Sequence, residues 1–319
     1  MEYRSLGRSG LRVSTVGLGC NNFGRQKTLT GTQEGTNAVI DAAIDAGITL
    51  FDTADIYGSE RGLSETLMGV ALKKRRSEIV LATKFGMDMQ GANGPDWGAR
   101  GSRRYIRLAV EASLKRLQTD WIDLYQLHQP DPLTPIDETL AALDELIAEG
   151  KVRYIGHSNL SGWQIADAEY TARLGSHPRF ISAQNEYSLL VRGVEAEVLP
   201  AVNNYGLGFL PFFPLANGLL TGKFTRAGGP ADSRVMAIRP HVHDEAPWDA
   251  IEAYAAFCTE LGVTMLEATF GWLLAQPGLT SVIAGTTKPE QIAQNAAAGS
   301  TSLSAEDVAT IGVLFAKAE

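Results

Sequence analysis

The stretch Gly47–Gly69, GITLFDTADIYGSERGLSETLMG, begins with an apolar run and ends in a helix-like segment. The run Ile48–Phe51 is typical of a buried strand, and a helix is expected from about Glu60. Asp52 directly follows the strand, and Tyr57 lies in the turn before the helix. A carboxylate at the end of a buried strand needs a partner, because burying a lone charge is costly. The stretch therefore predicts a functional site at this strand end.

The composition is that of a soluble globular protein. The 319 residues are 45% hydrophobic and 20% charged, and the formal net charge of −8 comes without a basic block, so nucleic acid is not an expected partner. The N-terminus lacks the apolar segment of a secretory signal, and prolines and a glycine interrupt the apolar stretch Gly206–Leu220, so no membrane span is expected. Cys20 and Cys258 predict no disulfide, and a cytoplasmic location is expected. No metal site is predicted.

Strand-like and helix-like segments alternate along the chain. A hairpin of Tyr3–Leu6 and Leu11–Val13 is expected first. Eight strands then alternate with helices, at Val16–Leu18, Ile48–Phe51, Glu78–Thr83, Ile122–Leu127, Val152–Gly156, Phe180–Ala183, Gly208–Phe213 and Ser281–Ala284. Two long loops are expected, at Met87–Gly101 and Thr221–Pro247, and long loops in compact domains tend to be functional.

This alternation predicts a parallel sheet of class α/β. Eight units in one chain of this length fit a closed (β/α)₈ TIM barrel, formed by residues 1–319 as a single domain. The N-terminal hairpin and extra C-terminal helices, such as Trp248–Leu261 and a last one from about Ala305, are additions to the barrel. A doubly wound open sheet is the alternative, but the first strand–helix turn, GLGCNNFG, lacks the G-x-G-x-x-G spacing expected there.

Four reactive side chains are expected to meet at one end of this barrel, because the C-terminal ends of its strands converge on one face. Asp52, Lys84 and His128 follow the second, third and fourth strands, and Tyr57 lies in the loop after the second. Asp52 and Lys84 can neutralise each other, and a cation close to Tyr57 would lower the phenol's pKa from about 10. Tyr57 can then act as a general acid, while His128 donates a hydrogen bond to a substrate oxygen.

Seven motifs are distributed in order along the chain. They are FDTADIYGSERGLSETLMG (51–69), LATKFG (81–86), DLYQLHQPD (123–131), GKVRYIGHSN (150–159), QNEYSLL (184–190), PLANGLLTGKF (214–224) and GTTKPEQIAQN (285–295). With this order and spacing, the chain resembles the aldo-keto reductases from about Arg4 to Asn295. The resemblance implies a (β/α)₈ barrel and an NADP-dependent oxidoreductase that needs no Rossmann motif.

By this resemblance, Asp52, Tyr57, Lys84 and His128 match the family's catalytic tetrad. The implied reaction is hydride transfer from NADPH to an aldehyde or ketone, or the reverse oxidation of an alcohol, with Tyr57 as general acid or base. NADP is favoured as cofactor, and use of NAD stays open.

The resemblance also implies a set of cofactor contacts, among which Ser158, Asn159 and Gln184 match residues that bind the nicotinamide carboxamide. The full set is Gly19, Cys20, Asn21, Asp52, Ser158, Asn159, Gln184, Phe212, Phe213, Pro214, Leu215, Gly218, Lys223, Arg234, Gly285, Thr286, Lys288, Gln291 and Asn295. Phe212 stands where Tyr or Trp is common and keeps a ring for stacking. Phe213 replaces a frequent Ser and can equally be a core residue. Gln291 stands where Arg often binds the 2′-phosphate.

The substrate is the least defined part of the prediction. Phe23 and Trp97 are expected to line the pocket beside Tyr57 and His128, although Trp97 can equally pack on its own loop. Small or varied aldehydes and ketones are the expected substrates, and the oligomeric state is not predicted. Two alternatives stay open: a cofactor-bound regulatory subunit resembling potassium-channel β subunits, and a sugar or sterol alcohol dehydrogenase. His157, before Ser158, is expected to pack behind its strand.

Overall fold

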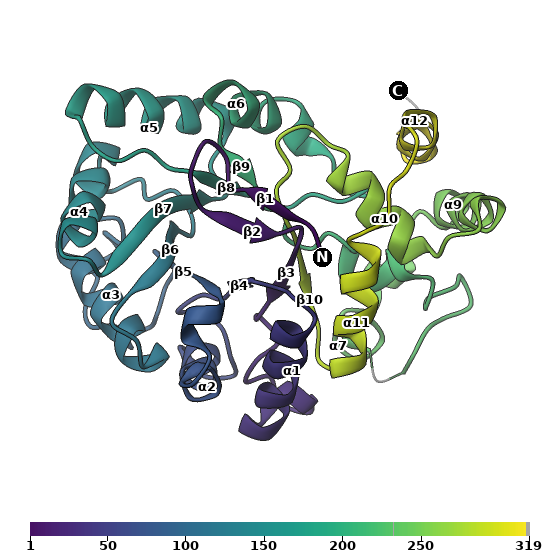
Figure 1. The fold of residues 1–319 in the computed structure, drawn as a ribbon, viewed down its shortest axis with the longest axis horizontal. Coiled ribbons are helices and arrows are strands. Elements are labelled where there is room, and N and C mark those ends of the chain that lie inside the picture. Colours follow the sequence, from purple (N-terminus) through teal and green to yellow (C-terminus); the bar gives the residue numbers. More distant parts are fainter. Residues whose placement is uncertain (232, 317–319) are drawn as a thin grey trace.

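The computed structural model describes residues 1–231 and 233–316, and in these ranges eight parallel strands form one sheet (Figure 1). Their order is β10-β3-β4-β5-β6-β7-β8-β9. The strands are β3 (Val16–Gly19), β4 (Leu50–Asp52), β5 (Val80–Phe85), β6 (Ile122–Leu127), β7 (Val152–Ser158), β8 (Ser182–Gln184), β9 (Gly208–Phe209) and β10 (Val282–Gly285). A parallel bridge from Phe209 to Leu279 joins β9 to the segment that leads into β10. The predicted (β/α)₈ barrel is therefore confirmed, and the open-sheet alternative is wrong.

Helices surround the strands on the outside (Figure 1). Those that follow the barrel strands are α1 (Gln33–Asp45), α2 (Leu63–Leu72), α3 (Arg103–Leu117), α4 (Ile136–Ala148), α5 (Gly162–Gly175), α6 (Val198–Tyr205), α10 (Met265–Leu274) and α11 (Pro289–Ala298). The extra C-terminal helices α9 (Trp248–Leu261) and α12 (Ala305–Leu314) pack beside α10. Side-chain caps define several starts: Thr32 accepts from the Gly35 N–H before α1, and Thr264 forms a capping box with Glu267 before α10.

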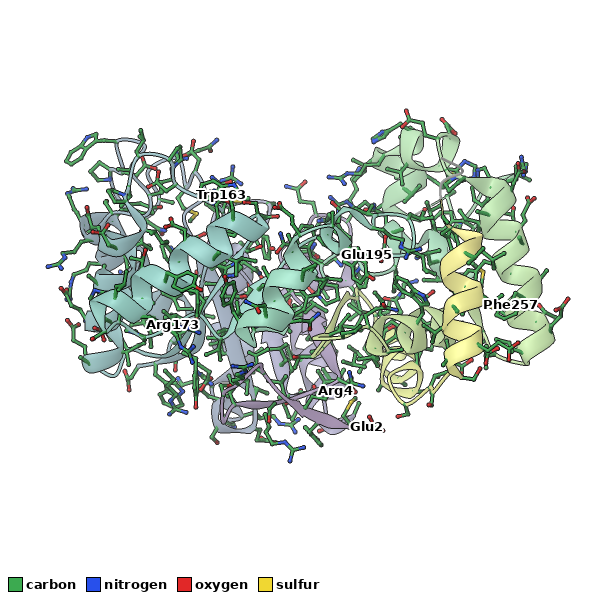
Figure 2. All side chains as sticks on the ribbon, turned by 90° about the horizontal axis from the view of Figure 1, so that it is seen from above. Glu2, Arg4, Trp163, Arg173, Glu195 and Phe257 are labelled. Atoms are coloured by element: carbon green, nitrogen blue, oxygen red, sulfur yellow. The ribbon has the colours of Figure 1, made fainter. Side chains whose placement is uncertain are left out.

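The N-terminal hairpin, β1 (Tyr3–Ser5) and β2 (Arg12–Ser14), closes one end of the barrel. Leu6 and Val13 pack in one apolar cluster with Leu50, Leu124 and Ile283 from the barrel strands. In Figure 2 the hairpin residues Glu2 and Arg4 lie at the bottom, whereas Trp163, at the start of α5, lies toward the opposite end. The C-terminal ends of the strands therefore remain as the open end of the barrel.

Some predicted boundaries were wrong. The predicted loop Thr221–Pro247 contains two short helices, α7 (Arg234–Ile238) and α8 (Pro240–Asp244), which are too brief to show a hydrophobic period. The predicted strand Gly208–Phe213 stops at Phe209, because Pro211 lacks the N–H that a ladder needs. Four short 3₁₀ turns, Leu29–Gly31, Arg76–Glu78, Gly193–Glu195 and Ala216–Thr221, complete the described elements.

Candidate active site

Asp52 and Lys84 form a buried ion pair at the open end of the barrel. Asp52 is the last residue of β4, and Lys84 lies near the end of the neighbouring β5. The Lys84 ammonium donates to Asp52 Oδ2 at 2.6 Å and to the Thr53 carbonyl at 2.9 Å, and Lys84 has no exposed surface. The structure thus places the predicted partner of Asp52 in direct contact with it.

Tyr57 reaches this pair from the turn between β4 and α2. The turn is held by main-chain hydrogen bonds from the Tyr57 N–H to Ala54 and from the Ser64 N–H to the Tyr57 carbonyl, both 3.1 Å. Lys84 Nζ lies 5.2 Å from the centre of the Tyr57 ring and shares a side-chain hydrogen bond with Tyr57. The ring of His128, which follows β6, meets the Tyr57 ring edge-on at 5.9 Å. All four predicted catalytic side chains therefore converge.

The expected fall in the pKa of Tyr57 was wrong. Burial is the largest effect on the phenol and raises its pKa, and the nearby Lys84 lowers it by less. For Lys84, burial acts to lower the pKa of the ammonium, but Asp52 and Tyr57 together outweigh it, and the pKa is raised. The net result is a protonated phenol beside a charged lysine, an arrangement suited to giving a proton to a strongly basic oxygen.

His128 is held neutral. Burial, followed by the positive charge of Lys84, lowers its pKa well below the ordinary value. Its Nδ1 is buried, with no hydrogen-bond partner among the described residues. Asn159 Nδ2 donates to the His128 carbonyl at 2.9 Å and so ties the end of β6 to the end of β7. A neutral imidazole in this position can donate one hydrogen bond to a substrate without adding charge to the site.

Gln126 belongs to the same group of side chains, and it was not predicted. It lies on β6, is fully buried, and donates from Nε2 to Asp52 Oδ1 at 3.2 Å. The signal was present in the sequence, because Leu124, Gln126 and His128 share one face of a strand whose inward positions are usually apolar.

The residues predicted to bind the nicotinamide carboxamide lie close together at the ends of β7 and β8. Ser158 Oγ donates to the Gln184 carbonyl at 2.7 Å, and Asn159 Nδ2 donates to Ser158 Oγ at 3.0 Å. Gln184 Nε2 donates to Asp52 Oδ1 at 3.0 Å. This polar edge therefore adjoins the Asp52–Lys84 pair.

The segment after β9 bends sharply around Gly218. Phe212 and Phe213 form an edge-to-face pair with ring centres 5.4 Å apart, and Phe213 is half-exposed outside the strand. Gly218 has φ +100°, and a Cβ there would lie 2.9 Å from Lys223 Nζ. A side chain at residue 218 would be strained by this backbone conformation, which glycine adopts readily. Pro214 and Leu215 lie at the entry to the same bend.

The predicted phosphate segment lies at the end of β10 and the start of α11. A Cβ on Gly285 would lie 3.1 Å from Asn22 Nδ2 and 3.4 Å from Asn21 Oδ1, so the first and last barrel strands approach closely here. Gln291 Oε1 accepts from Thr286 Oγ1 at 2.6 Å and from the Thr287 N–H at 3.0 Å. Gln291 therefore stabilises its own turn. Other predicted members of this region, Gly19, Cys20, Lys288 and Asn295, lie at the end of β3 or in the α11 segment.

Arg234 lies near two further arginines that were not predicted. Arg234 starts α7, and burial together with Arg25 and Arg239 lowers its pKa to about 10. The three guanidiniums are half-buried, and in residues 1–231 and 233–316 none forms an ion pair with a carboxylate. Glu186 is the acid whose pKa responds to Arg239, although burial raises that pKa overall. Half-buried arginines that form no ion pair within the described residues suit the phosphates of a dinucleotide.

The two predicted pocket aromatics lie in different surroundings. Phe23 has no exposed surface and packs in the main hydrophobic core, so the structure does not place it on an open pocket. Trp97 is 76% exposed and lies under the guanidinium of Arg104 at 4.1 Å. A hollow of about 720 Å³ lies between the turn after Tyr57 and the loop that carries Trp97. Its lining is Ser59, Glu60, Arg61, Met89, Gln90, Gly91 and Ala92.

The described residues contain no helix long and apolar enough to cross a membrane. They also contain no group of three or more His, Cys, Asp or Glu side chains placed to hold a metal ion.

Comparison with known proteins agrees with this geometry. The model of the Aldo/keto reductase family matches residues 15–314. The chain is 40% identical to the uncharacterized oxidoreductase YrpG of Bacillus subtilis (strain 168), with 99% of this chain and 96% of that protein covered. It is 38% identical to a probable voltage-gated potassium channel subunit beta of Oryza sativa subsp. japonica, covering 92% and 90%. It is 35% identical to the L-glyceraldehyde 3-phosphate reductase of Escherichia coli (strain K12), covering 92% and 86%. The chain therefore belongs to the aldo/keto reductase family and is an oxidoreductase.

Proposed function

We propose that this protein reduces aldehydes or ketones to alcohols with NADPH, and that Tyr57 is the general acid. The observation that carries the proposal is the contact of the Tyr57 phenol with a buried, Asp52-paired Lys84. In a reduction the carbonyl oxygen becomes strongly basic, and the protonated phenol supplies its proton. Lys84 stabilises the phenolate that remains, and Asp52 keeps the ammonium in place. His128 orients the carbonyl by donating a hydrogen bond.

The residues at the open end suit a nicotinamide dinucleotide. Ser158, Asn159 and Gln184 offer the donors and acceptors that a carboxamide needs. Arg25, Arg234 and Arg239 offer cations without acidic partners in the described chain, which favours the more anionic NADP over NAD. When bound, NADPH would supply the hydride. Use of NAD as a second cofactor stays part of the proposal.

Small or varied aldehydes and ketones are the proposed substrates. The E. coli relative is named for reduction of a phosphorylated aldehyde, which supports this class of carbonyl. The site can also run the reaction backward, because the phenolate that remains after proton transfer is a base. Physiological oxidation of a sugar or sterol alcohol is therefore retained as an alternative direction. A cytoplasmic location is supported by two buried cysteines with free thiols.

The test is a panel of aldehydes, ketones and alcohols, including 4-nitrobenzaldehyde, assayed with NADPH, NADH and their oxidised forms. Tyr57→Phe should lower kcat by about 10²–10⁴-fold, the range for loss of a general acid. Tyr125→Phe is the matched control, because the Tyr125 hydroxyl is buried without a hydrogen-bond partner among the described residues. A Tyr57→Phe variant as active as wild type would refute the role given to Tyr57.

A second candidate is a cofactor-bound regulatory subunit, as the name of the rice relative suggests. The complete set of Asp52, Tyr57, Lys84 and His128 side chains in contact distance favours the enzyme. The two functions separate in one measurement. A regulatory subunit would bind NADPH tightly and turn over none of the panel, whereas the proposed reductase turns over at least one carbonyl class.

A further inference from the structure

A layer of polar side chains lies at the end of the barrel core where the strands have their C-terminal ends. In a (β/α)₈ barrel, inward side chains from alternate strands lie in one layer. β4, β6 and β8 are alternate strands and contribute Asp52, Gln126 and Gln184, which are 3%, 0% and 2% exposed. Two residues earlier on β4 and β6, Leu50 and Leu124 pack together in an apolar cluster. The outermost layer is therefore a set of buried polar groups that must satisfy one another.

Asp52 divides its two oxygens between a charged side and a neutral side. Oδ2 accepts from Lys84 Nζ at 2.6 Å. Oδ1 accepts from Gln126 Nε2 at 3.2 Å and from Gln184 Nε2 at 3.0 Å. Gln184 Nε2 also lies 3.4 Å from Gln126 Oε1, so Gln126 contacts both of the other members of the layer.

The two glutamines differ in their other neighbours. Gln184 ends its strand beside Ser158 at the proposed carboxamide site, so a change there would disturb cofactor binding as well. Gln126 has no exposed surface and precedes His128 by two residues inside β6. Its hydrogen bonds run to Asp52 and Gln184, and the shorter one, to Asp52, leads directly to Lys84.

We propose that Gln126 is a positioning residue of the reaction, acting through Asp52. Its amide holds Oδ1, so that Oδ2 faces Lys84 and the ammonium stays within reach of Tyr57. Without this donor Oδ1 keeps only the hydrogen bond from Gln184, so the carboxylate can turn further toward Lys84 and draw the ammonium away from the phenol. The inference rests on the proposed function, since it concerns the proton that Tyr57 transfers.

Gln126→Met tests this role because methionine keeps the length of the side chain and removes its polar atoms. We expect kcat to fall about tenfold or more, the scale of one hydrogen bond to a charged group, while KM for NADPH stays within about twofold of wild type. The alkaline limb of the pH–kcat profile should move to higher pH, because Lys84 no longer lowers the pKa of the phenol to the same extent. Leu124→Met, on the same face of β6, is the control and should show neither change.

Gln126→Glu gives an independent readout. The new carboxyl can donate to Asp52 only while it is protonated, and it repels Asp52 once it ionises. We expect kcat close to wild type at low pH and a loss as the pH rises, a dependence that a purely structural role does not produce. Thermal unfolding of every variant ensures that folded proteins are compared.

Three possible results test the role of Gln126. A tenfold loss of kcat with a shifted pH profile in Gln126→Met, and a loss of kcat with rising pH in Gln126→Glu, support the inference. Unchanged kcat and pH profiles in both variants of an active enzyme overturn it and leave the proposed function intact. A wild type that reduces no carbonyl overturns the proposed function instead, and the inference falls with it.

Discussion

Lys84 Nζ lies 2.6 Å from Asp52 Oδ2 on the neighbouring strand, and both side chains are buried. Replacing Lys84 by methionine would leave the carboxylate inside the barrel without its cation. We expect Lys84→Met to lower the free energy of unfolding by about 3–5 kcal/mol and to abolish carbonyl reduction. Urea unfolding followed by circular dichroism measures the first effect, and a steady-state assay measures the second.

The double variant Asp52→Asn, Lys84→Met is the control for this prediction. It has no unpaired charge, so it should recover part of the lost stability while remaining inactive. If the double variant is no more stable than Lys84→Met alone, the loss does not arise from the unpaired carboxylate.

The stability of the protein in mild acid should depend on His157. This side chain lies on β7, packs edge-on against Phe180, and has both ring nitrogens without partners in the described part of the chain. Burial lowers its pKa to about 3, whereas histidine in an unfolded chain has a pKa of about 6.5. The unfolded chain therefore binds a proton in this interval that the folded protein does not. The contribution of the neutral imidazole to the free energy of unfolding is complete above about pH 6.5 and is lost as the pH falls toward 3.

His157→Leu removes the proton that the unfolded chain binds at this position. Between the two pKa values, the free energy of unfolding of wild type should fall with decreasing pH more steeply than that of His157→Leu. We expect the two slopes to differ by about 1.4 kcal/mol per pH unit. Urea unfolding at several pH values measures the slope. His177→Gln, at a half-buried histidine that contacts Asp144, is the comparison. Equal slopes for wild type and His157→Leu would contradict the prediction.

The barrel and the tetrad could be predicted from the sequence because both depend on local order. The alternation of strands and helices defines the barrel. A residue that directly follows a strand lies at the C-terminal end of that strand, and this position does not depend on how the helices pack. Asp52, Lys84 and His128 were found in this way. The two short helices after β9 were missed because each has five residues, too few for a period to emerge.

Other features depend on packing between distant segments and could not be predicted. The pKa of Tyr57 rises because burial exceeds the effect of Lys84, and the extent of burial is not visible in a motif. Phe23 was predicted to line the pocket, but its side chain is fully buried in the hydrophobic core. The charges of Arg25 and Arg239 influence each other because the segments after β3 and β9, far apart in the sequence, come close in space.

Gly218→Ala should weaken both the fold and cofactor binding. The backbone at this position has φ +100°, and the added methyl group would meet Lys223 Nζ at 2.9 Å. We expect the free energy of unfolding to fall by about 1–3 kcal/mol from backbone strain, and NADPH affinity to fall because the bend shifts. Gly193→Ala is the matched control, since its added Cβ meets no atom within 4 Å. Equal stability of the two variants would show that the bend tolerates a side chain.

Arg234 offers the sharpest test of the cofactor site. Burial and the charges of Arg25 and Arg239 disfavour this guanidinium, so a bound anion beside it would be stabilised. We expect Arg234→Gln to weaken NADPH binding by about tenfold, equal to about 1.4 kcal/mol, and to weaken NADH binding less, because NADH lacks the 2′-phosphate. Titrations followed by tryptophan fluorescence, repeated at rising salt, give both dissociation constants. Arg226→Gln is the control, because Arg226 is exposed and paired with Glu252. Equal losses for NADPH and NADH would assign Arg234 to the diphosphate that the two cofactors share, and no loss for either would remove it from the site.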